Sequence, residues 1–569
     1  MTPPHRRRRP RRAAAYRAVR RVAAACAAAV VVVGAAAAGR DPGASGDLVL
    51  PLVAAVAAMA VAAYTSVRRR LRTRTRTTPG GHAPTVVRLD ELDLRARRLL
   101  VGTDDCVRTS REELRWAAAQ LGDEAIRGHA EALEAAASEL AAAFGMRQRL
   151  DDGEEGARAL LEEIVARCGA AGRRLDAEAP GFDRTRALER TAPGALEHAE
   201  ARFREPAARV AEADGTLAEL RGRYALSACL PVTGHDEQAR DRLFFAATCL
   251  HRGRRAVDLG HTGSAVVHLR AAEAAVDQAT LLVAGIARLA SALAAAARVL
   301  PDALTAAETD LREAAVGSAR TDLRTRIAHG EAVVARLRRE LGEEKGGPGT
   351  GGRGVLDPVG ALRRVEEVAA GLDRASRRRP EGPRALDRLE RALLVARSSV
   401  GAASDYVTTR RGAVGCEART RLAEAERRLR AAERTGASAP VSAPAPAPSP
   451  GPASALAAAL ADAREADTLA RQARQLAERD VRAYGTPYGE GIWTGGAVLG
   501  GILLGAPHRP GAPEGHPGDG GPAGYGGPGT RARRDGGELF RTERPRRPSA
   551  RRRDDGPAEP PAAGPPDSP

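Results

Sequence analysis

Apolar residues recur along much of this chain at alternating steps of three and four positions, the spacing of one face of an α-helix. The longest run begins near His268 and continues without a miss up to Pro301. Its members are Leu269, Ala272, Val276, Ala279, Val283, Ile286, Ala290, Leu293, Ala297 and Leu300. The run predicts a coiled-coil-like a/d seam of more than four heptads that ends at the proline. A shorter seam follows at Leu386, Leu389, Leu393, Ala396 and Val400.

Turn residues divide the helical pattern of residues 88–433 into segments of a few tens of residues. A Gly-rich stretch at 343–354 predicts a flexible break. The shorter turn or capping signals are Asp151-Asp152-Gly153, Pro180-Gly181, Pro193-Gly194, Pro231 with Gly234, and Gly260 with Gly263. We therefore expect an all-α fold, in which an elongated array of antiparallel helix pairs forms within one chain.

The composition changes after this helical region. Residues 434–453 alternate Pro with Ala and Ser, which predicts an extended linker. A last helix is expected at 454–483, and the Gly- and Pro-rich tail at 484–569 is expected to be disordered. An apolar patch at 495–505 is too short to span a bilayer. Its role is left open between an unstructured segment and a contact with a bilayer surface or a partner.

Two apolar segments, 22–38 and 48–67, precede the helical region and predict a transmembrane hairpin. Nine Arg occur in the basic N-terminus, 1–21, and six in the basic linker, 68–87, whereas the loop at 39–47 has one Arg and two Asp. Under the positive-inside rule both Arg-rich flanks stay in the cytoplasm. The helical domain and the C-terminus are therefore expected to be cytoplasmic, in a multi-pass protein of the cell membrane.

The first apolar segment, 22–38, has two other readings. A basic start, an apolar stretch and the small residues Ala36–Ala38 also describe a cleavable signal peptide. Cleavage would leave 48–67 as a single anchor and would keep the helical domain in the cytoplasm. A buried soluble hairpin is the remaining reading, although the chain offers little apolar surface to cover it.

Composition favours a protein of long packed helices, and the distribution of charge argues against a nucleic-acid-binding protein. Aromatic residues make up only 3% of the chain, and hydrophobic residues reach 43% largely through Ala, which favours long helices packed through narrow seams. The net charge of +17 is concentrated at the N-terminus, since residues 1–76 contribute +14 and residues 508–569 contribute +2. The helical region is close to neutral, so nucleic acid is not an expected partner.

The best metal candidate is a group of Cys and His side chains around one predicted turn, Cys249, His251, His261 and His268. Two of these, Cys249 and His251, lie on different helix faces, and zinc sites need three or four converging ligands. The six cysteines are scattered, without C-x-x-C spacing, which indicates reduced, buried thiols. A metal-binding enzyme that uses Cys249, His251 and His261 is therefore only an alternative hypothesis, and we assign no metal ligand.

No catalytic or cofactor-binding residue is assigned either. The glycines of 346–354 lack the G-K-[ST] ending of a phosphate-binding loop. The adjacent carboxylates Asp104 and Asp105 are not expected to converge, because neighbouring residues of a helix point in different directions. Instead, Thr103 or Asp104, or Thr109 with Glu112, have the chemistry and spacing to begin a helix.

Several stretches resemble the cytoplasmic helical region of TPM-domain membrane proteins from high-GC bacteria. They are Val101–Asp105, Val107–Ser110, Phe144–Asp152, Arg410–Gly415, Glu417–Glu424, Gly495–Gly505 and Gly529–Arg531. That family has an extracytoplasmic TPM domain before its membrane helix. Here only 39–47 separates the two apolar segments, which leaves no room for that domain, so activities of the TPM domain are not carried over.

The leading hypothesis is a non-enzymatic, membrane-anchored scaffold or adaptor that binds protein partners. The bilayer is its first expected partner, and homo-oligomerisation is left open. A second hypothesis is an accessory subunit of a separately encoded TPM-domain protein. The resemblance implies kinship with a membrane-tethered helical module but does not specify a mechanism.

Overall fold

The computed structural model describes residues 87–316, 320–345, 356–376, 382–438, 452–484 and 524–534. From Arg88 onward they belong to one compact unit, Arg88–Pro569, of the two into which the chain divides. These residues form helices and turns without any β-strand among them, which confirms the all-α fold class. The apolar segments 22–38 and 48–67 and the patch 495–505 lie outside the described residues.

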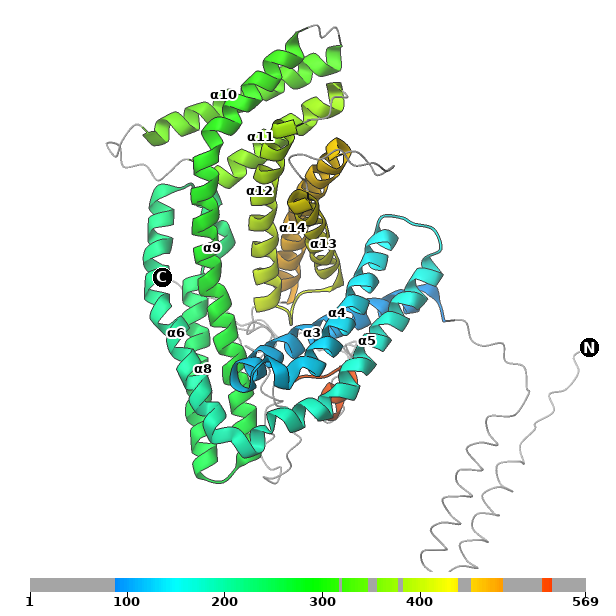
Figure 1. The fold of residues 1–569 in the computed structure, drawn as a ribbon, viewed down its shortest axis with the longest axis vertical. Helices are drawn as coiled ribbons and strands as arrows, with labels where there is room; N and C mark the ends of the chain where they lie inside the picture. The colour runs from blue at the N-terminus through cyan, green and yellow to red at the C-terminus, as the bar shows by residue number, and fades with distance from the viewer. Residues whose placement is uncertain are drawn as a thin grey trace, which may run out of the picture. The chain divides into compact units, whose positions relative to one another are not determined.

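The first three described helices pack against one another as a group that we call the α3–α5 bundle (Figure 1). They are α3 (Leu89–Leu121), α4 (Asp123–Asp151) and α5 (Ala157–Arg186). Gly122 and Gly153 form the two turns with φ of 85° and 89°, a conformation that residues with a Cβ rarely adopt. The sequence predicted the second turn and missed the first.

Helix α9 (Thr262–Ala315) is the longest described element, and α6 and α8 pack along it (Figure 1). The chain before it forms α6 (Leu188–Arg223), α7 (Leu226–Cys229), the short 3-10 helix η2 (Leu230–Val232) and α8 (His235–Asp258). The predicted seam is confirmed, since eight of its ten residues are buried and Ala290 and Ala297 are partly buried against the same core. Alanine at these positions lets the neighbouring helices approach closely.

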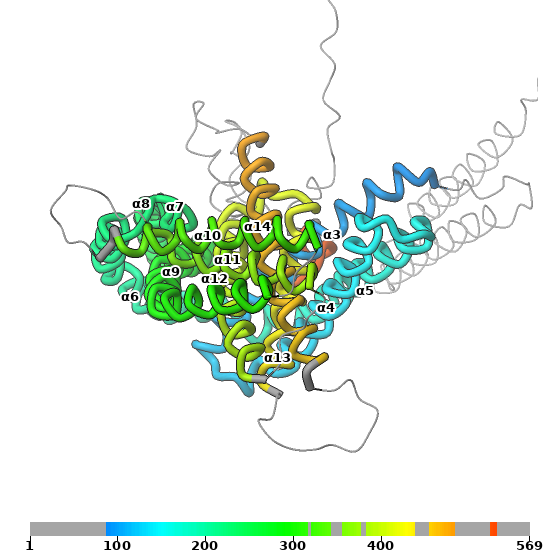
Figure 2. Tube along the Cα trace, turned by 90° about the horizontal axis from the view of Figure 1, so that it is seen from above, coloured from blue at the N-terminus to red at the C-terminus, as the bar shows by residue number. Residues whose placement is uncertain are grey.

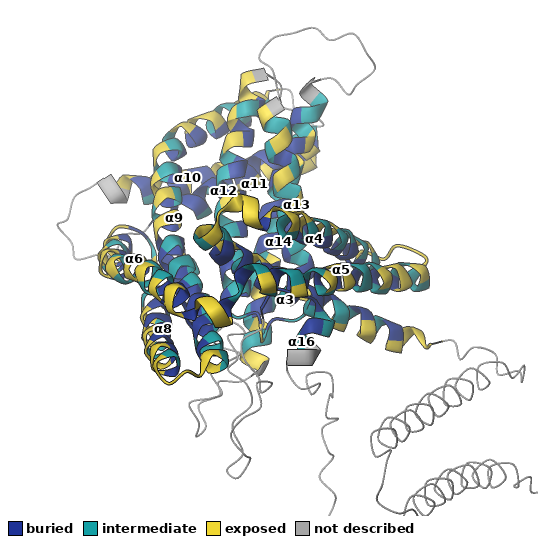
Figure 3. Cartoon of the chain, turned by 60° about the horizontal axis from the view of Figure 1, so that its bottom comes forward, coloured by how far each residue is buried: buried dark blue, intermediate teal, exposed yellow. Residues whose placement is uncertain are grey.

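The remaining helices complete the unit. They are α10 (Thr321–Lys345), α11 (Pro358–Ser376), α12 (Gly382–Thr409), α13 (Cys416–Ser438), α14 (Pro452–Tyr484) and α16 (Pro528–Arg534). α10 lies beside α11, and α11 beside α12 (Figure 2), while α14 packs on both α12 and α13. Buried residues line the inward faces of these helices and exposed residues the outward faces (Figure 3). α10 and α13 each extend a few residues into the ranges 343–354 and 434–453, which the sequence assigned to linkers.

Three prolines that the sequence treated as breaks lie inside helices. Pro180 is within α5, Pro193 within α6 and Pro301 within α9. An interior proline costs about 3 kcal/mol. Burial on both sides of Pro301, at Leu300 and Leu304, outweighs that cost.

The real break between α5 and α6 is a single alanine. Ala187 adopts a left-handed conformation with φ of 45°. Alanine carries no turn signal, so the sequence pattern could not locate this break.

Within the described residues, only α9 is long and apolar enough to cross a bilayer by length and composition. Its most apolar 18 residues have a mean hydropathy of 1.8, and 44% of that window is buried inside the protein. The buried face contacts α6, α8, α11 and α12, so the helix packs as part of the core.

We expect Leu300→Ala to lower the free energy of unfolding by about 2–5 kcal/mol, because it opens a cavity beside the proline of α9. Leu300 is fully buried, whereas Leu259 is 61% exposed and supplies the matched control. Leu259→Ala should change the free energy of unfolding by less than about 1 kcal/mol. Urea denaturation followed by circular dichroism measures both, and equal effects would contradict the assignment of α9 to the core.

Candidate interaction site around helix α3

Helix α3 carries an unusual number of buried polar side chains for a helix that packs in a bundle. Thr103, Asp104, Thr109, Ser110 and Glu113 are all less than a tenth exposed. The sequence interpreted several of them as helix-start signals, and this prediction is wrong, because α3 runs uninterrupted from Leu89 to Leu121. Their side chains instead contact parts of the chain that are far away in sequence.

The first of these contacts joins α3 to α13 through Arg419, which is 1% exposed. Its Nη1 lies 2.6 Å from Asp104 Oδ2 and 2.7 Å from Asp105 Oδ1. Its Nη2 and Nε donate to the backbone carbonyls of Arg411 and Val414, at 2.5 and 3.1 Å. The two adjacent carboxylates therefore do converge, contrary to the sequence-based expectation, because one guanidinium reaches across the helix surface to both.

Two further arginines reinforce this junction. Arg108 Nε lies 3.0 Å from Asp104 Oδ2, and its Nη1 donates to Thr408 Oγ1 at 3.0 Å. Arg411 makes a bidentate contact with Glu112 at 2.9 and 3.0 Å. Burial alone would raise the pKa of Asp104, but Arg108 and Arg419 outweigh it and hold that pKa below its ordinary value. The carboxylate is therefore ionised and paired at neutral pH.

A second junction joins α3 to the end of α5 and to α9. Arg186 is 1% exposed and lies 2.5 Å from both Glu113 Oε2 and Glu273 Oε1. Arg270 contacts Glu113 at 3.4 Å and so shares this carboxylate. Burial raises the pKa of Glu273 to about 7, against the pull of Arg186. Because the planar guanidinium of Arg186 donates to two carboxylates at once, it fixes direction as well as distance.

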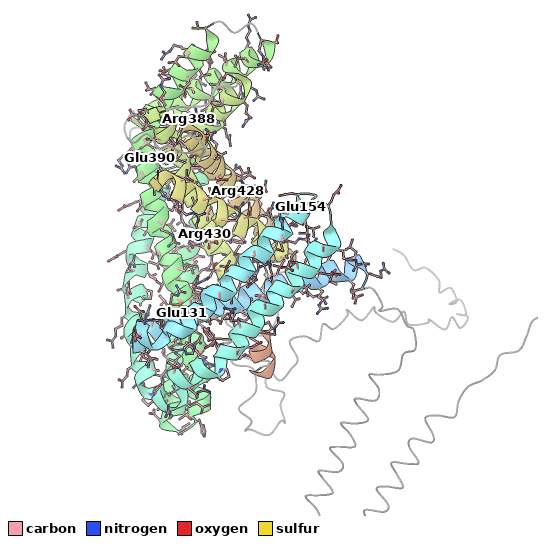
Figure 4. All side chains as sticks on the ribbon, turned by 45° about the vertical axis from the view of Figure 1, so that its right-hand side comes forward. Glu131, Glu154, Arg388, Glu390, Arg428 and Arg430 are labelled. Carbon is pink, nitrogen blue, oxygen red and sulfur yellow. The ribbon has the colours of Figure 1, made fainter. Side chains whose placement is uncertain are left out.

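The same chemistry recurs away from α3, where α11, α12 and α14 meet. Glu366 accepts from Arg391 at 3.1 Å and from Arg464 at 2.9 Å. Arg388 is buried and pairs with Asp373 at 2.7 Å, whereas Glu390, two positions further on, is exposed (Figure 4). Buried Arg–carboxylate pairs thus join helices throughout the described chain.

A third contact on α3 comes from the C-terminal segment Gly524–Arg531. Tyr525 is fully buried, and its ring stacks on Phe182 of α5 with 4.6 Å between centroids. The ring also meets the edge of His129 of α4 at 6.0 Å, and its hydroxyl donates to the His129 carbonyl at 2.9 Å. Burial raises the pKa of the Tyr525 hydroxyl, so this donor stays protonated. One aromatic residue thereby touches two helices of the bundle.

The glycines that follow allow the backbone of the segment to lie directly on the bundle. Gly526 has φ of 145° and donates its N–H to Ser110 Oγ at 3.1 Å. A Cβ at Gly527 would lie 2.1 Å from the carbonyl oxygen of Gly172, and a Cβ at Gly172 would lie 2.8 Å from Pro528 Cδ. Close approach of two backbones therefore requires glycine on both sides.

Polar contacts fix the end of the segment. The Asp176 carboxylate of α5 accepts from the backbone N–H groups of Gly529 and Thr530 at 3.0 and 2.6 Å, and from the Thr530 hydroxyl at 2.7 Å. Arg531 Nη2 donates to the Asp105 carbonyl and to Thr109 Oγ1, both at 2.7 Å. Asp105 thus contacts the segment through its backbone and α13 through its side chain.

The prediction that the whole tail at 484–569 is disordered is wrong for residues 524–534, which contain α16 and this segment. The composition rule failed because a single anchor, Tyr525, and the glycines around it serve a tertiary contact rather than flexibility. The one available signal was the resemblance of Gly529–Arg531 to the helical region of TPM-domain membrane proteins.

The Cys and His group suggested as a metal site is not assembled. Among the described residues no three His, Cys, Asp or Glu side chains are placed to hold one metal ion. Cys249 is buried on α8, whereas His251 and His261 are exposed, and His268 lies half-buried on α9. The five cysteines within the described ranges are free and buried, and burial raises the pKa of Cys249 to about 11.

The chain is distantly homologous to two proteins of Mycobacterium tuberculosis. These are UPF0603 protein Rv2345 of strain H37Rv and UPF0603 protein MT2410 of strain CDC 1551, and the chain is 31% identical to each over 431 residues. The matched stretch is 74% of this chain and 62% of each relative, so the chain spans less than two thirds of their length. No protein-family model matches the chain. No solved structure matches it either.

We expect Arg419→Met to lower the free energy of unfolding by about 3–5 kcal/mol at neutral pH, because it removes a buried guanidinium that pairs with Asp104 and Asp105 and leaves two backbone carbonyls without their donor. Arg397, whose pair with Glu433 is 56% and 36% exposed, supplies the control. Arg397→Met should cost less than about 1 kcal/mol.

The pH dependence of this effect has a defined sign. Because the folded-state pKa of Asp104 is lowered, the stability from this pair is present above the ordinary carboxyl range and is lost as the pH falls through the folded pKa. Denaturant midpoints measured from pH 7 down to pH 3 should therefore converge for Arg419→Met and the parent chain. A constant difference across that range would contradict the role given to Asp104.

Proposed function

We propose that this chain is a membrane-anchored cytoplasmic adaptor, in which α3 links the anchor to the rest of the helical unit and the outer faces of the unit bind protein partners. The observation that carries the proposal is the convergence on α3. This helix is the first to follow the basic linker 68–87, and buried ion pairs join it to α5, α9, α13 and the turn between α12 and α13. A helix held in this way has a fixed position within the unit that begins at Arg88.

Buried ion pairs suit an adaptor better than a flexible tether. Each guanidinium must meet its carboxylate with good geometry, because a buried charge without its partner costs several kcal/mol. The helices are therefore fixed in register as well as packed. A rigid unit loses little conformational freedom on binding, which favours affinity for partners.

The membrane part of the proposal rests on charge. The Arg-rich flanks 1–21 and 68–87 surround two apolar segments whose connecting loop has one Arg and two Asp. The positive-inside rule then places residues 68–569 in the cytoplasm. With the first segment cleaved as a signal peptide, the same placement holds.

A second candidate function is an accessory subunit of a separately encoded TPM-domain protein. The resemblance of stretches such as Val101–Asp105 and Glu417–Glu424 to the helical region of TPM-domain membrane proteins motivates it. In this proposal a TPM domain lies on a separate chain, and the helical unit contacts that chain at the membrane. Co-purification of a TPM-domain protein with the tagged chain would distinguish it from the adaptor alone.

Topology gives the first test. In intact spheroplasts we expect a C-terminal tag to resist protease and to be cut only after lysis, and we expect the protein to stay in the membrane fraction through an alkaline wash. A tag that is cut in intact spheroplasts would invert the proposed topology. Release by the alkaline wash would exclude the membrane anchor.

An exposed aromatic residue marks a face on which to look for partners. Phe244 of α8 is 78% exposed in a chain with only 3% aromatic residues, and aromatic residues are enriched at protein–protein interfaces. We expect a photo-crosslinking phenylalanine analogue at Phe244 to give discrete adducts in cells. The same analogue at Glu390, an exposed position on α12, should give fewer. Equal patterns at both positions would argue against α8 as a partner-binding face.

A further inference from the structure

The C-terminal segment Gly524–Arg531 contacts the α3–α5 bundle as a peptide ligand would. Residues 485–523 separate it from the end of α14, a span of 39 residues. Its position is therefore not imposed by a neighbouring helix and must come from its own contacts. Those contacts involve one buried aromatic ring, four backbone or side-chain hydrogen bonds to α3 and α4, and a carboxylate on α5.

The contacts also select a sequence. The ring of Tyr525 fills the space beside Phe182, and its hydroxyl needs the His129 carbonyl. No side chain fits at Gly527, because its Cβ would collide with backbone of α5. Binding of this kind combines an anchor with exclusion of wrong sequences, which is how peptide-recognition sites achieve specificity.

Residues of the α3–α5 bundle match the segment in hydrogen bonding and in shape. Asp176 accepts three hydrogen bonds from the segment. Ser110 is fully buried beneath the segment and accepts the Gly526 N–H. Gly172 leaves the space that Pro528 occupies, because a Cβ there would lie 2.8 Å from Pro528 Cδ. These features come from α3 and α5.

We propose that the surface formed by α3, α4 and α5 is a peptide-binding site for the sequence Tyr-Gly-Gly-Pro-Gly-Thr-Arg, and that a second copy of this chain supplies the same segment in trans when the site is empty. This inference deepens the proposed function, since it gives the adaptor a specific site and ligand. It can fail while the membrane-adaptor proposal stands, because it is tested without reference to topology or to other proteins.

The segment belongs to the same chain as its site, so a second copy must compete with it. A ligand that is tethered to its site has an effective concentration that an untethered copy has to exceed. Binding in trans should therefore be weak for the parent chain and strong once the tethered segment is disabled.

The experiment uses the full chain in detergent and a fluorescent peptide of residues 522–534. We expect a chain carrying Tyr525→Ala to bind this peptide at least tenfold more tightly than the parent chain, whose site is occupied. A chain carrying Gly527→Ala empties the site by a second route and should behave in the same way. Adding Asp176→Ala to either variant should abolish binding, and so should Gly527→Ala within the peptide itself.

A complementary pair of chains tests exchange between copies. Tyr525→Ala leaves an empty site and an inactive segment, whereas Asp176→Ala leaves an active segment and a damaged site. We expect an equimolar mixture of the two to form a mixed dimer by analytical ultracentrifugation, while each variant alone does not. Absence of a mixed dimer would overturn the claim of exchange in trans.

Two results would overturn the site itself. One is equal binding of the peptide by the parent chain, the Tyr525→Ala chain and the Gly527→Ala chain. Equal binding would mean that the peptide binds to another surface. The other is no binding by either emptied variant while circular dichroism shows the helical content of the parent chain. If only the Tyr525→Ala chain loses helical content, binding of the peptide by the Gly527→Ala chain tests the proposed site.

Discussion

Arginine–carboxylate pairs buried between helices are the constraint on which the arrangement of this chain depends. The chain has few aromatic residues and much alanine, so its seams are narrow and resemble one another. Apolar packing through such seams gives stability but little choice of partner helix. The pairs of Arg186 with Glu113 and of Arg419 with Asp104 determine which helices pair, because a planar guanidinium donates its hydrogen bonds in fixed directions and needs its carboxylates at matching places. Misplaced helices would leave buried charges without partners, at a cost of several kcal/mol.

Apolar seams stabilise the helices and ion pairs determine which helices pair, and this difference explains what the sequence could predict. Regular seams are local, so the burial of Leu269 to Leu300 followed from spacing alone. Ion pairs are not local, since Arg419 and Asp104 are 315 residues apart, and no pattern in a single sequence connects them. The predictions of where helices end failed for a related reason. Pro301 stays helical because tertiary burial outweighs its local cost, and Ala187 turns the chain although alanine has no preference for that conformation.

The sequence did not reveal the site around α3 because the same residue types can either begin a helix or contact a distant part of the chain. Asp104 and Thr109 have the chemistry of helix caps, and the sequence interpretation used that local role. In the structure both face other parts of the chain, Asp104 towards Arg419 and Thr109 towards Arg531. The docked C-terminal segment was missed for the opposite reason. Its glycines were interpreted as flexibility, whereas at Gly527 the absence of a side chain is what permits contact with the backbone of α5.

The proline inside α9 has a mechanical consequence. This helix of 54 residues is about 80 Å long, and a proline removes one hydrogen bond from the ladder, so its bending stiffness is lowest near Pro301. Before that point the helix carries α6 and α8. Beyond it, Glu308 pairs with Arg338 of α10 and Leu311 packs against Gly330 of the same helix. Helix α12 contacts α9 on both sides of the proline, through Asp405 with Arg288 and through Arg384 with Glu313, so any bending of α9 at Pro301 would have to move α12 as well.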